Sequence, residues 1–477
     1  MERILTAEQM RRADEFTIKT LGVDEKTLIE RAGTAVFDEI VKRFKGGRVL
    51  VCVGKGNNGE DGKIVAQKLS KIHGFYVSVL NFSLGAIKFF DKKYDIIVDC
   101  LFGTGLNREI TGVYKEVIDK INESKSYVIS CDIPSGLSAD TGKPLGVAVK
   151  ANLTVSIQEY KLGHFINDGP DYCGTVVNKD IGISVWEDDF TLRLNSDDVA
   201  KYFPHRKRNV NKGNFGKVLI MGGSKDFSGS AFLSYNSLSA LKTGRGYSYL
   251  CVPESLFSIY ALKNPEIIIK TAKDNNGFFS FDEVFLNGIL NMDSIAFGMG
   301  VGVSEEIYKI IEFLLKNYTG KLIIDADGLN TLAKFGKEIL KNAKCQVVLT
   351  PHVGEFSRLT GLSKEYITDN FITVSENFAQ EYGVTLLLKS ATSVITDGER
   401  VFLNTTGCSG LSKGGSGDVL CGIIAGLIAG SNDFTESVAA AAFLFGFTGE
   451  IAQKESSEFT LTASEVIDKL PAAIKKL

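Results

Sequence analysis

The sequence predicts an α/β protein with two domains, residues 1–200 and 201–477, each built around its own sheet. Three observations carry this prediction. First, 477 residues exceed what one ordinary hydrophobic core organises. Second, short apolar runs rich in β-branched residues alternate with helical segments and glycine-rich loops, as in βαβ units. Third, this alternation breaks down between residues 185 and 210, where the chain becomes charged and poorly periodic.

The first half opens with an amphipathic stretch over 10–44 and then alternates apolar runs with loops. Because these runs do not alternate polar and apolar residues, we expect strands buried on both faces of a parallel sheet. The expected strands are RVLVCV (48–53), YVSVLNF (76–82), YDIIVD (94–99), YVISCD (127–132) and ANLTVSI (151–157).

The same pattern resumes in the second half, after a basic cluster at Arg206–Arg208. That cluster is either a solvated linker or a contact for a ligand phosphate. A hairpin is predicted over 393–404, with its turn at Asp397–Gly398. The other expected strands are KVLIMGG (217–223), YSYLCVP (247–253), SIAFGMG (294–300), KLIIDAD (321–327), QVVLTPH (346–352) and VTLLLKS (384–390).

Composition indicates a cytoplasmic protein with small-molecule partners. A net charge of −3 lacks the basic excess of nucleic-acid binders. The eight cysteines include no CxxC pair, which favours reduced thiols, and the four histidines have no zinc-site spacing. The N-terminus lacks the apolar segment of a signal peptide, and the apolar run at 419–430 is shorter than the roughly 20 residues of a membrane span, so no membrane partner is expected.

The loop after the first strand contains GxGxxG at Gly54, Gly56 and Gly59. The next strand, however, ends without the acidic residue that holds a ribose, which disfavours an ordinary dehydrogenase. A Walker A loop is excluded, because Ile64 follows Gly62–Lys63 where that motif requires Ser or Thr.

Oxygen-bearing side chains follow three of the expected strands. Their oxygens suit a cation of loose geometry or the polar groups of a sugar-phosphate ligand. Alternatively, each of them simply closes a tight turn. The residues are Asn57, Asn58, Asp61, Asp99, Asp132 and Ser135.

Four motifs of the first half resemble the NAD(P)HX epimerase domain of bifunctional NAD(P)H-hydrate repair enzymes: GKGNNGEDG, VDCLFGTGL, DIPSGLSADTG and YKLGH. NAD(P)HX denotes hydrated NADH or NADPH. The resemblance implies a Rossmann-like three-layer sandwich, K⁺ held by Asn58, Asp99 and Ser135, and catalytic roles for Asp132 and Lys161. The implied substrate-binding residues are Asn57, Asn58, Gly59, Glu60, Asp61, Gly103, Thr104, Gly105, Leu106, Asn107, Arg108, Glu109 and Asp132.

Two positions depart from that family pattern. Glu60 stands where the family usually has Gly, and Ser138 where it has Asp. A carboxylate at Glu60 opposes an anionic dinucleotide unless its side chain turns outward. The first domain is therefore either an epimerase or a non-catalytic nucleotide-binding module.

A polar turn precedes a long apolar run at GLSKGGSGDVLCGIIAGLIAG (410–430). Its one acid, Asp418, either caps a buried helix or lies where glycine amides and the helix dipole favour phosphate. With IIDADGLN and LTPHVGEFSRL, this stretch resembles the ADP- or ATP-dependent NAD(P)HX dehydratases, which have a ribokinase-like α/β sandwich. The resemblance implies that Asp418 is the catalytic acid-base residue and that Ser230, Gly302 and His352 contact the hydrate.

The implied nucleotide site binds ADP or ATP with Mg²⁺. Its residues are Lys389, Ser390, Ala391, Thr392, Ser393, Gly410, Leu411, Ser412, Lys413, Gly414, Gly415, Ser416 and Gly417. The expected function is epimerisation of R- and S-NAD(P)HX and nucleotide-dependent dehydration of the S form, with ADP as the expected donor and a homo-oligomer as the expected assembly. The alternative is a small-alcohol or vitamin kinase, since GxGD in this fold usually serves phosphorylation of a stable hydroxyl.

Overall fold

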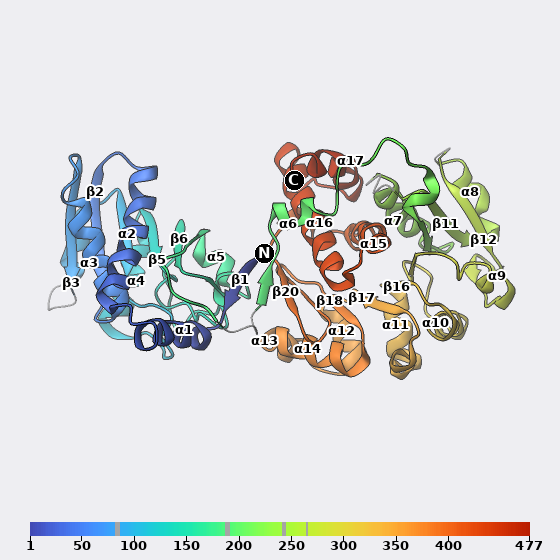
Figure 1. Ribbon diagram of the computed structural model, residues 1–477, viewed down its shortest axis with the longest axis horizontal. Coiled ribbons are helices and arrows are strands. Elements are labelled where there is room, and N and C mark those ends of the chain that lie inside the picture. Colours follow the sequence, from blue (N-terminus) through green and yellow to red (C-terminus); the bar gives the residue numbers. More distant parts are fainter. Residues whose placement is uncertain (82–85, 187–190, 241–244, 264–265) are drawn as a thin grey trace. The chain divides into compact units, whose positions relative to one another are not determined.

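The computed structural model describes residues 1–81, 86–186, 191–240, 245–263 and 266–477 (Figure 1). By its contacts the chain forms two compact units, one of residues 2–191 and one of residues 192–477 with Met1. The predicted boundary region, 185–210, includes residues 187–190, which lie outside the described residues. The last residue of the predicted strand 76–82 also lies outside them.

The N-terminal unit contains a parallel sheet in the order β3-β2-β4-β5-β6-β8. All five predicted strands of this half are confirmed. The strands are β2 (Gly47–Val53), β3 (Phe75–Asn81), β4 (Ile96–Cys100), β5 (Tyr127–Cys131), β6 (Leu153–Ile157) and β8 (Thr175–Lys179). Outside this six-stranded sheet, β1 (Glu2–Leu5) pairs in parallel with β7 (Tyr160–Lys161).

Helices cover both faces of this sheet, which confirms the three-layer sandwich. Along β2, Val49 and Val51 pack into the cluster that contains α2 and α3, whereas Leu50 and Cys52 pack into the cluster that contains α4. This alternation follows from the two-residue repeat of a strand. The helices are α1 (Ala7–Lys19), α2 (Glu25–Arg43), α3 (Asn57–Leu69), α4 (Gly112–Glu123) and α5 (Gly169–Cys173).

The sheet of the C-terminal unit runs β12-β11-β10-β15-β16-β17-β18-β19-β20. It is parallel from β12 to β18, and the predicted hairpin β19–β20 adds two antiparallel strands. The bounds are β10 (Lys217–Met221), β11 (Tyr247–Pro253), β12 (Ile268–Ala272), β15 (Ser294–Phe297), β16 (Lys321–Ile324), β17 (Gln346–Leu349), β18 (Thr385–Leu388), β19 (Ser393–Thr396) and β20 (Val401–Asn404).

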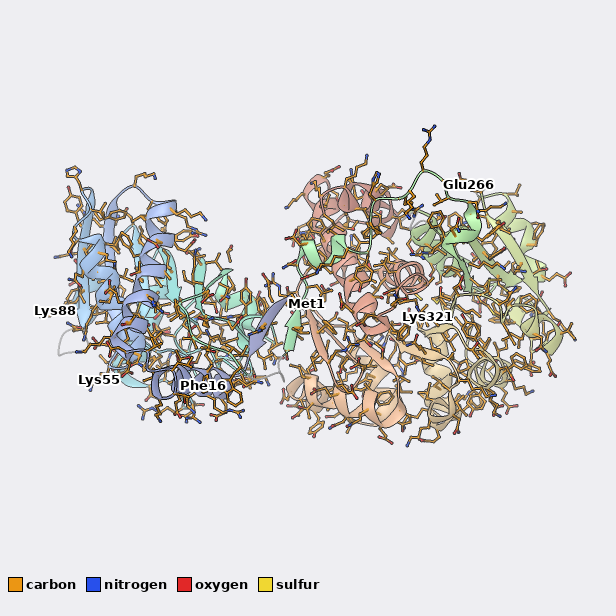
Figure 2. The ribbon with its side chains drawn as sticks, in the orientation of Figure 1. Met1, Phe16, Lys55, Lys88, Glu266 and Lys321 are labelled. Atoms are coloured by element: carbon orange, nitrogen blue, oxygen red, sulfur yellow. The ribbon has the colours of Figure 1, made fainter. Side chains whose placement is uncertain are left out.

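Two helical layers enclose this sheet. Against one face pack α7 (Ser228–Ala240), α15 (Ser416–Ile428), α16 (Phe434–Glu455) and α17 (Ala463–Ile474). Against the other pack α10 (Glu305–Asn317), α11 (Asp327–Phe335), α12 (Val353–Thr360) and α14 (Phe371–Tyr382). Figure 2 shows side chains filling the space between these layers and the strands.

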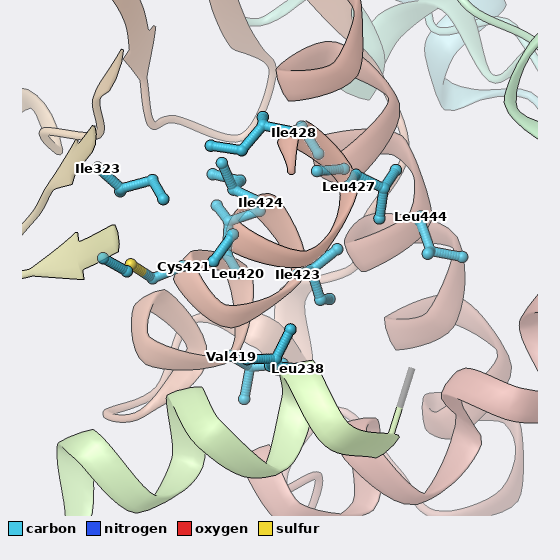
Figure 3. Close-up of a cluster of buried hydrophobic side chains, with 14 of the residues drawn as sticks. Leu238, Ile323, Val419, Leu420, Cys421, Ile423, Ile424, Leu427, Ile428 and Leu444 are labelled. Carbon is cyan, nitrogen blue, oxygen red and sulfur yellow. The ribbon is translucent and has the colours of Figure 1, made fainter. Parts of the chain in front are cut away.

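Helix α15 forms the centre of this core. Residues 419–428 are all buried, and Figure 3 shows them surrounded by Leu238 of α7, Ile323 of β16 and Leu444 of α16. Within the described ranges, no helix is both long and apolar enough to span a bilayer. The burial of α15 instead fixes the position of its first turn, which belongs to the site described below.

Candidate active sites

A cavity of about 770 Å³ lies at the carboxyl ends of β2, β4 and β5 in the N-terminal unit. Ligands of open α/β sheets bind at this edge. The predicted residues that line it are Asn57, Asn58, Asp61, Gly103, Thr104, Gly105, Leu106, Asn107, Arg108, Asp132 and Lys161. Gly59, Glu60 and Glu109 are not among the lining residues, whereas Asp14, which the sequence analysis missed, is.

The glycines of the GxGxxG loop allow α3 to start directly at this cavity. A side chain on Gly54 would lie 1.9 Å from the carbonyl oxygen of Leu101, so no larger residue fits there. The close approach brings Asn57 and Asn58, in the first turn of α3, beside the loop that follows β4.

Asp99, Ser135 and Asn58 form a buried polar cluster behind the cavity. The Asp99 carboxylate accepts from the Ser135 hydroxyl at 2.6 Å and from the Ser135 amide at 2.8 Å. Burial raises the pKa of Asp99 although these hydrogen bonds oppose the shift. The Asn58 amide donates to the Phe102 carbonyl at 2.8 Å, while its own buried Oδ1 has no partner within the part of the chain that the structure describes.

Asp132 adopts a backbone conformation that is unusual for any residue but glycine, with φ of +67°. Its carboxylate accepts from the Ile157 amide at 3.0 Å and forms an ion pair with Lys161, whose side chain is fully buried. The Lys161 ammonium also donates to the Ile157 carbonyl at 2.7 Å. The carboxylate therefore faces the cavity with its charge matched by one cation.

His164, from the motif YKLGH, holds this arrangement from behind. Its Nδ1 accepts from the Lys161 amide at 3.1 Å, so Nε2 carries the proton and donates to the Asp132 carbonyl at 2.8 Å. Burial lowers the pKa of His164 to about 4, which keeps the ring neutral. From the sequence, His164 was predicted only as part of this motif, with no role.

The two departures from the family pattern both point away from the cavity. Glu60 pairs with Lys63 on the exposed side of α3. The Ser138 hydroxyl accepts from the Thr141 amide at 3.2 Å and closes a turn. Neither side chain lines the cavity, so neither places charge against a ligand there.

The C-terminal unit contains its own cavity, of about 790 Å³, at the first turn of α15. The predicted residues that line it are Ser230, His352, Lys389, Ser390, Ala391, Ser393, Leu411, Ser412, Lys413, Gly414, Gly415, Ser416, Gly417 and Asp418. Gly302, Thr392 and Gly410 are not among them. The lining residues that the sequence analysis gave no binding role include Phe227, Gly300, Asp325, Asn404, Thr406 and Phe445.

Asp418 is the third residue of α15 and lies beside the amides of the preceding glycine turn. The N-cap residue of the helix is Gly415, with φ of +93°, so Asp418 is not itself the N-cap. The nearby Ser230 hydroxyl acts to lower the pKa of Asp418, but this effect is outweighed. Burial, followed by the nearby charge of Asp325, raises the pKa of Asp418 to about 7.

Asp325 and Asp327 diverge from a strained turn at Ala326, whose φ is +50°. Asp325 is buried and accepts from the Lys389 ammonium at 3.1 Å. Asp327 accepts from the Gly302 amide at 2.9 Å. The two acids therefore support predicted site residues from behind: Asp325 orients Lys389, and Asp327 anchors the loop of Gly302.

Lys389 carries the positive charge beside the helix turn. Burial disfavours this charge, but Asp325 and Glu355 outweigh burial, and the pKa of Lys389 is raised. A side chain on Gly417 would lie 3.5 Å from the Lys389 ammonium, so this cation lies next to the turn.

His352 precedes α12 and caps it. Its Nδ1 accepts from the amides of Gly354 at 2.9 Å and Glu355 at 3.3 Å. Burial lowers the pKa of His352, although Glu355 opposes the shift. The side chain is 55% exposed and lines the cavity, and its Nε2 lies 3.7 Å from the Glu355 carboxylate.

Comparisons with known proteins match both units. A model of NAD(P)H-hydrate dehydratase matches residues 218–472, and one of the YjeF-related protein N-terminus matches 25–86 and 83–163. Curated relatives named bifunctional NAD(P)H-hydrate repair enzyme Nnr include those of Dictyoglomus turgidum, 32% identical over 100% of this chain and 99% of that protein, and Thermofilum pendens, 33% identical over 100% and 97%.

Solved structures resemble the C-terminal unit. An ADP/ATP-dependent NAD(P)H-hydrate dehydratase from Bacillus subtilis, crystallised with ATP and Mg²⁺, has a TM-score of 0.50 and 27% identity over 58% of this chain and 95% of that one. A ribokinase-like protein from Enterococcus faecalis has a TM-score of 0.51 and 25% identity over 60% and 95%. The C-terminal unit matches the dehydratase model, the N-terminal unit matches the YjeF-related model, and the curated relatives match along nearly their whole length. The chain therefore belongs to the family of bifunctional NAD(P)H-hydrate repair enzymes.

Proposed function

We propose that the chain restores NADH and NADPH from their hydrates, with the N-terminal unit interconverting R- and S-NAD(P)HX and the C-terminal unit dehydrating the S form. One observation carries this proposal most directly: the carboxylate of Asp418 lies beside the bare amides of a helix start and near the half-buried cation Lys389. A carboxylate, amide donors and a cation are the parts that phosphoryl transfer to a hydroxyl requires.

The dehydration follows from the weakness of hydroxide as a leaving group. Asp418 would accept the proton of the substrate hydroxyl while that oxygen attacks the terminal phosphorus. The amides of Gly415, Ser416 and Gly417 would stabilise the charge on the transferring phosphoryl. The ring nitrogen then expels phosphate, and loss of a ring proton restores the reduced nicotinamide.

The remaining residues of this cavity bind and orient. Ser230 and His352 would hold the hydrate, with the Gly302 loop held in place by Asp327. Lys389 and the loop 390–393 would bind nucleotide phosphates, as would the turn 410–417. Thr392 and Gly410 do not line the cavity and would act through the backbone of these segments.

We propose ADP as the donor, with ATP as an alternative substrate and Mg²⁺ bound to the phosphates. No group of three or more His, Cys, Asp or Glu side chains placed to hold a metal occurs among the described residues. Mg²⁺ commonly retains its waters and binds through substrate phosphates, so such a group is not required.

K⁺ fits the buried cluster of the N-terminal unit. The unpartnered Oδ1 of Asn58, with the oxygens of Asp99 and Ser135, is a set of oxygen donors suited to a large hard cation. A bound K⁺ would supply fixed positive charge next to the substrate loop. The same residues hold the loop after β4 by hydrogen bonds to Phe102.

The epimerase reaction would use Asp132 as its proton-transfer group. Its charge is balanced by Lys161 and its orientation is fixed by His164 and the Ile157 amide. A stereospecific dehydratase consumes one epimer, so an epimerase on the same chain makes the whole damaged pool recoverable.

We place these reactions in the cytoplasm, and we expect a homo-oligomer. The eight cysteines are all free thiols and seven are buried, which supports a reducing compartment. Exposed apolar side chains on and after α8 (Phe257–Ala261), including Phe257, Ile259 and Leu262, support self-association. Light scattering of the purified chain would measure the assembly.

The decisive experiment incubates the chain with mixed hydrates and either ADP or ATP. We expect reduced dinucleotide to appear with one phosphate per turnover and both epimers to be consumed, as followed by absorbance and chromatography. A stable phosphorylated product without NAD(P)H would instead identify a kinase.

A further inference from the structure

The epimerase cavity contains a second carboxyl group in surroundings opposite to those of Asp132. Asp61 lies in α3, is 8% exposed and lines the cavity. Its described partner is the Cys131 thiol, at 3.9 Å. Asp132, by contrast, has an ammonium and an amide donor on its carboxylate.

This inference rests on the proposed epimerase function. We propose that Asp61 is the general acid of epimerisation: it gives its proton to the departing hydroxyl, and Asp132 takes a proton from the incoming water. Two carboxyl groups with different protonation states are what an acid-base reaction at neutral pH requires. The contacts of the two groups differ in this sense, since Asp132 accepts from an ammonium and an amide, whereas the described partner of Asp61 is a thiol.

Three nearby carboxylates disfavour the charge of Asp61: Asp132, Asp14 and, on its own helix, Glu60. The Cys131 thiol donates to Asp61 at 3.9 Å and opposes this effect, and the Cys100 thiol lies nearby. Burial, followed by the charge of Asp132, raises the pKa of Asp61 to about 8, so the group carries its proton at neutral pH.

The proposed step balances without a redox partner. The carbon–oxygen bond at the hydroxylated ring carbon breaks, and its electron pair leaves with the oxygen as water once Asp61 has donated its proton. The lone pair of the ring nitrogen forms a carbon–nitrogen double bond. Water then adds to either face of that carbon, its proton passes to Asp132, and solvent in the cavity returns the proton to Asp61.

Asp14 offers a second way to test whether Asp61 is the acid. It lies on α1, lines the same cavity, and its negative charge is one cause of the raised pKa of Asp61. Burial raises the pKa of Asp14 itself to about 6, so it is mostly ionised at neutral pH. Asp14→Asn should therefore lower the pKa of Asp61 without removing the acid.

The test uses the full chain with the R hydrate and no nucleotide, with the uncatalysed rate subtracted. The wild type must produce the S epimer; if it does not, the proposed epimerase function fails along with this inference. If it does, Asp61→Asn should lower kcat by about 10²-fold or more with little change in KM. Wild-type rates in Asp61→Asn, or a loss confined to KM, would overturn the role of Asp61 alone.

The pH profile supplies a readout that a structural role would not produce. Wild-type kcat/KM should fall above about pH 8, and Asp14→Asn should move this fall to lower pH. An alkaline limb unmoved by Asp14→Asn would contradict the assignment.

A direct measurement covers the case in which Asp61→Asn fails to fold. Infrared difference spectra of the Asp418→Asn chain, which lacks the carboxyl that titrates near pH 7, should show a protonated carboxyl that is lost as pH rises through about 8. The absence of any carboxyl deprotonating there would refute the proposal.

Discussion

Replacing Asp325 should shift the pH dependence of dehydration in a direction that the structure determines. Asp325 is buried and, after burial itself, is the largest cause of the raised pKa of Asp418. Asp418 accepts a proton in the proposed step, so it must be ionised. Wild-type kcat/KM should therefore rise as pH increases through about 7.

The size of the shift follows from the order of the causes. The pKa of Asp418 is raised from 3.8 to about 7, and burial contributes more than Asp325 does. Removing the Asp325 charge should bring the pKa down by roughly one pH unit, the lower end of the effect of a like charge at close range. In Asp325→Asn the rise of kcat/KM should move to about pH 6.

The assay follows the absorbance of reduced nicotinamide with S-NAD(P)HX and saturating ADP across this pH range. Asp327→Asn is the matched control, because Asp327 lies on the same turn but makes the smallest of these contributions to the shift and accepts from the Gly302 amide. It should raise KM for the hydrate and leave the pH midpoint nearly unchanged. A midpoint that moves upward in Asp325→Asn, or moves equally in both variants, would refute the reasoning.

Four further changes test other parts of the structure. Gly415→Ala forces a side chain onto a residue with φ of +93°, where the new Cβ would lie 2.8 Å from Leu233. This change should lower the free energy of unfolding by about 1–3 kcal/mol and weaken ADP binding as measured by calorimetry. Ile424→Ala should lower the free energy of unfolding by about 2–5 kcal/mol in urea titrations, since the side chain is fully buried in α15. Asn58→Leu should abolish any rise in melting temperature that KCl gives over NaCl; a rise retained in this variant would rule out the proposed K⁺ site. Because the pKa of His164 is lowered to about 4, this residue contributes stability above about pH 6.5 that is lost as pH falls toward 4. The loss in the free energy of unfolding is at most about 3 kcal/mol. His164→Asn should flatten this pH dependence in denaturant titrations.

The strands and the loops at their ends were predictable because their signals are local. Buried parallel strands lack polar alternation, as in RVLVCV and KLII, and Asp418 follows a glycine turn before a run that only a buried helix could contain. Loops at the carboxyl ends of parallel strands share one edge, which is why Asn58 and Asp132 could be placed together from sequence.

The residues that the sequence analysis missed act through tertiary contacts. Asp14 lies on an amphipathic helix far along the chain from Asp132, and no local pattern shows that α1 covers the cavity. Asp325 was given no role from the sequence, because its pairing with Lys389 spans 64 positions. The outward turn of Glu60 likewise depends on Lys63 and on the direction in which α3 leaves the sheet.

The measurement that tests the central claim most directly compares the wild type with Asp418→Asn on S-NAD(P)HX and ADP. The wild type should release AMP, phosphate and reduced dinucleotide in equal amounts. The variant should bind ADP with similar affinity but lose about 10²-fold or more in turnover, since the hydroxyl then has no proton acceptor. Near-normal recovery of NAD(P)H by Asp418→Asn would contradict the account.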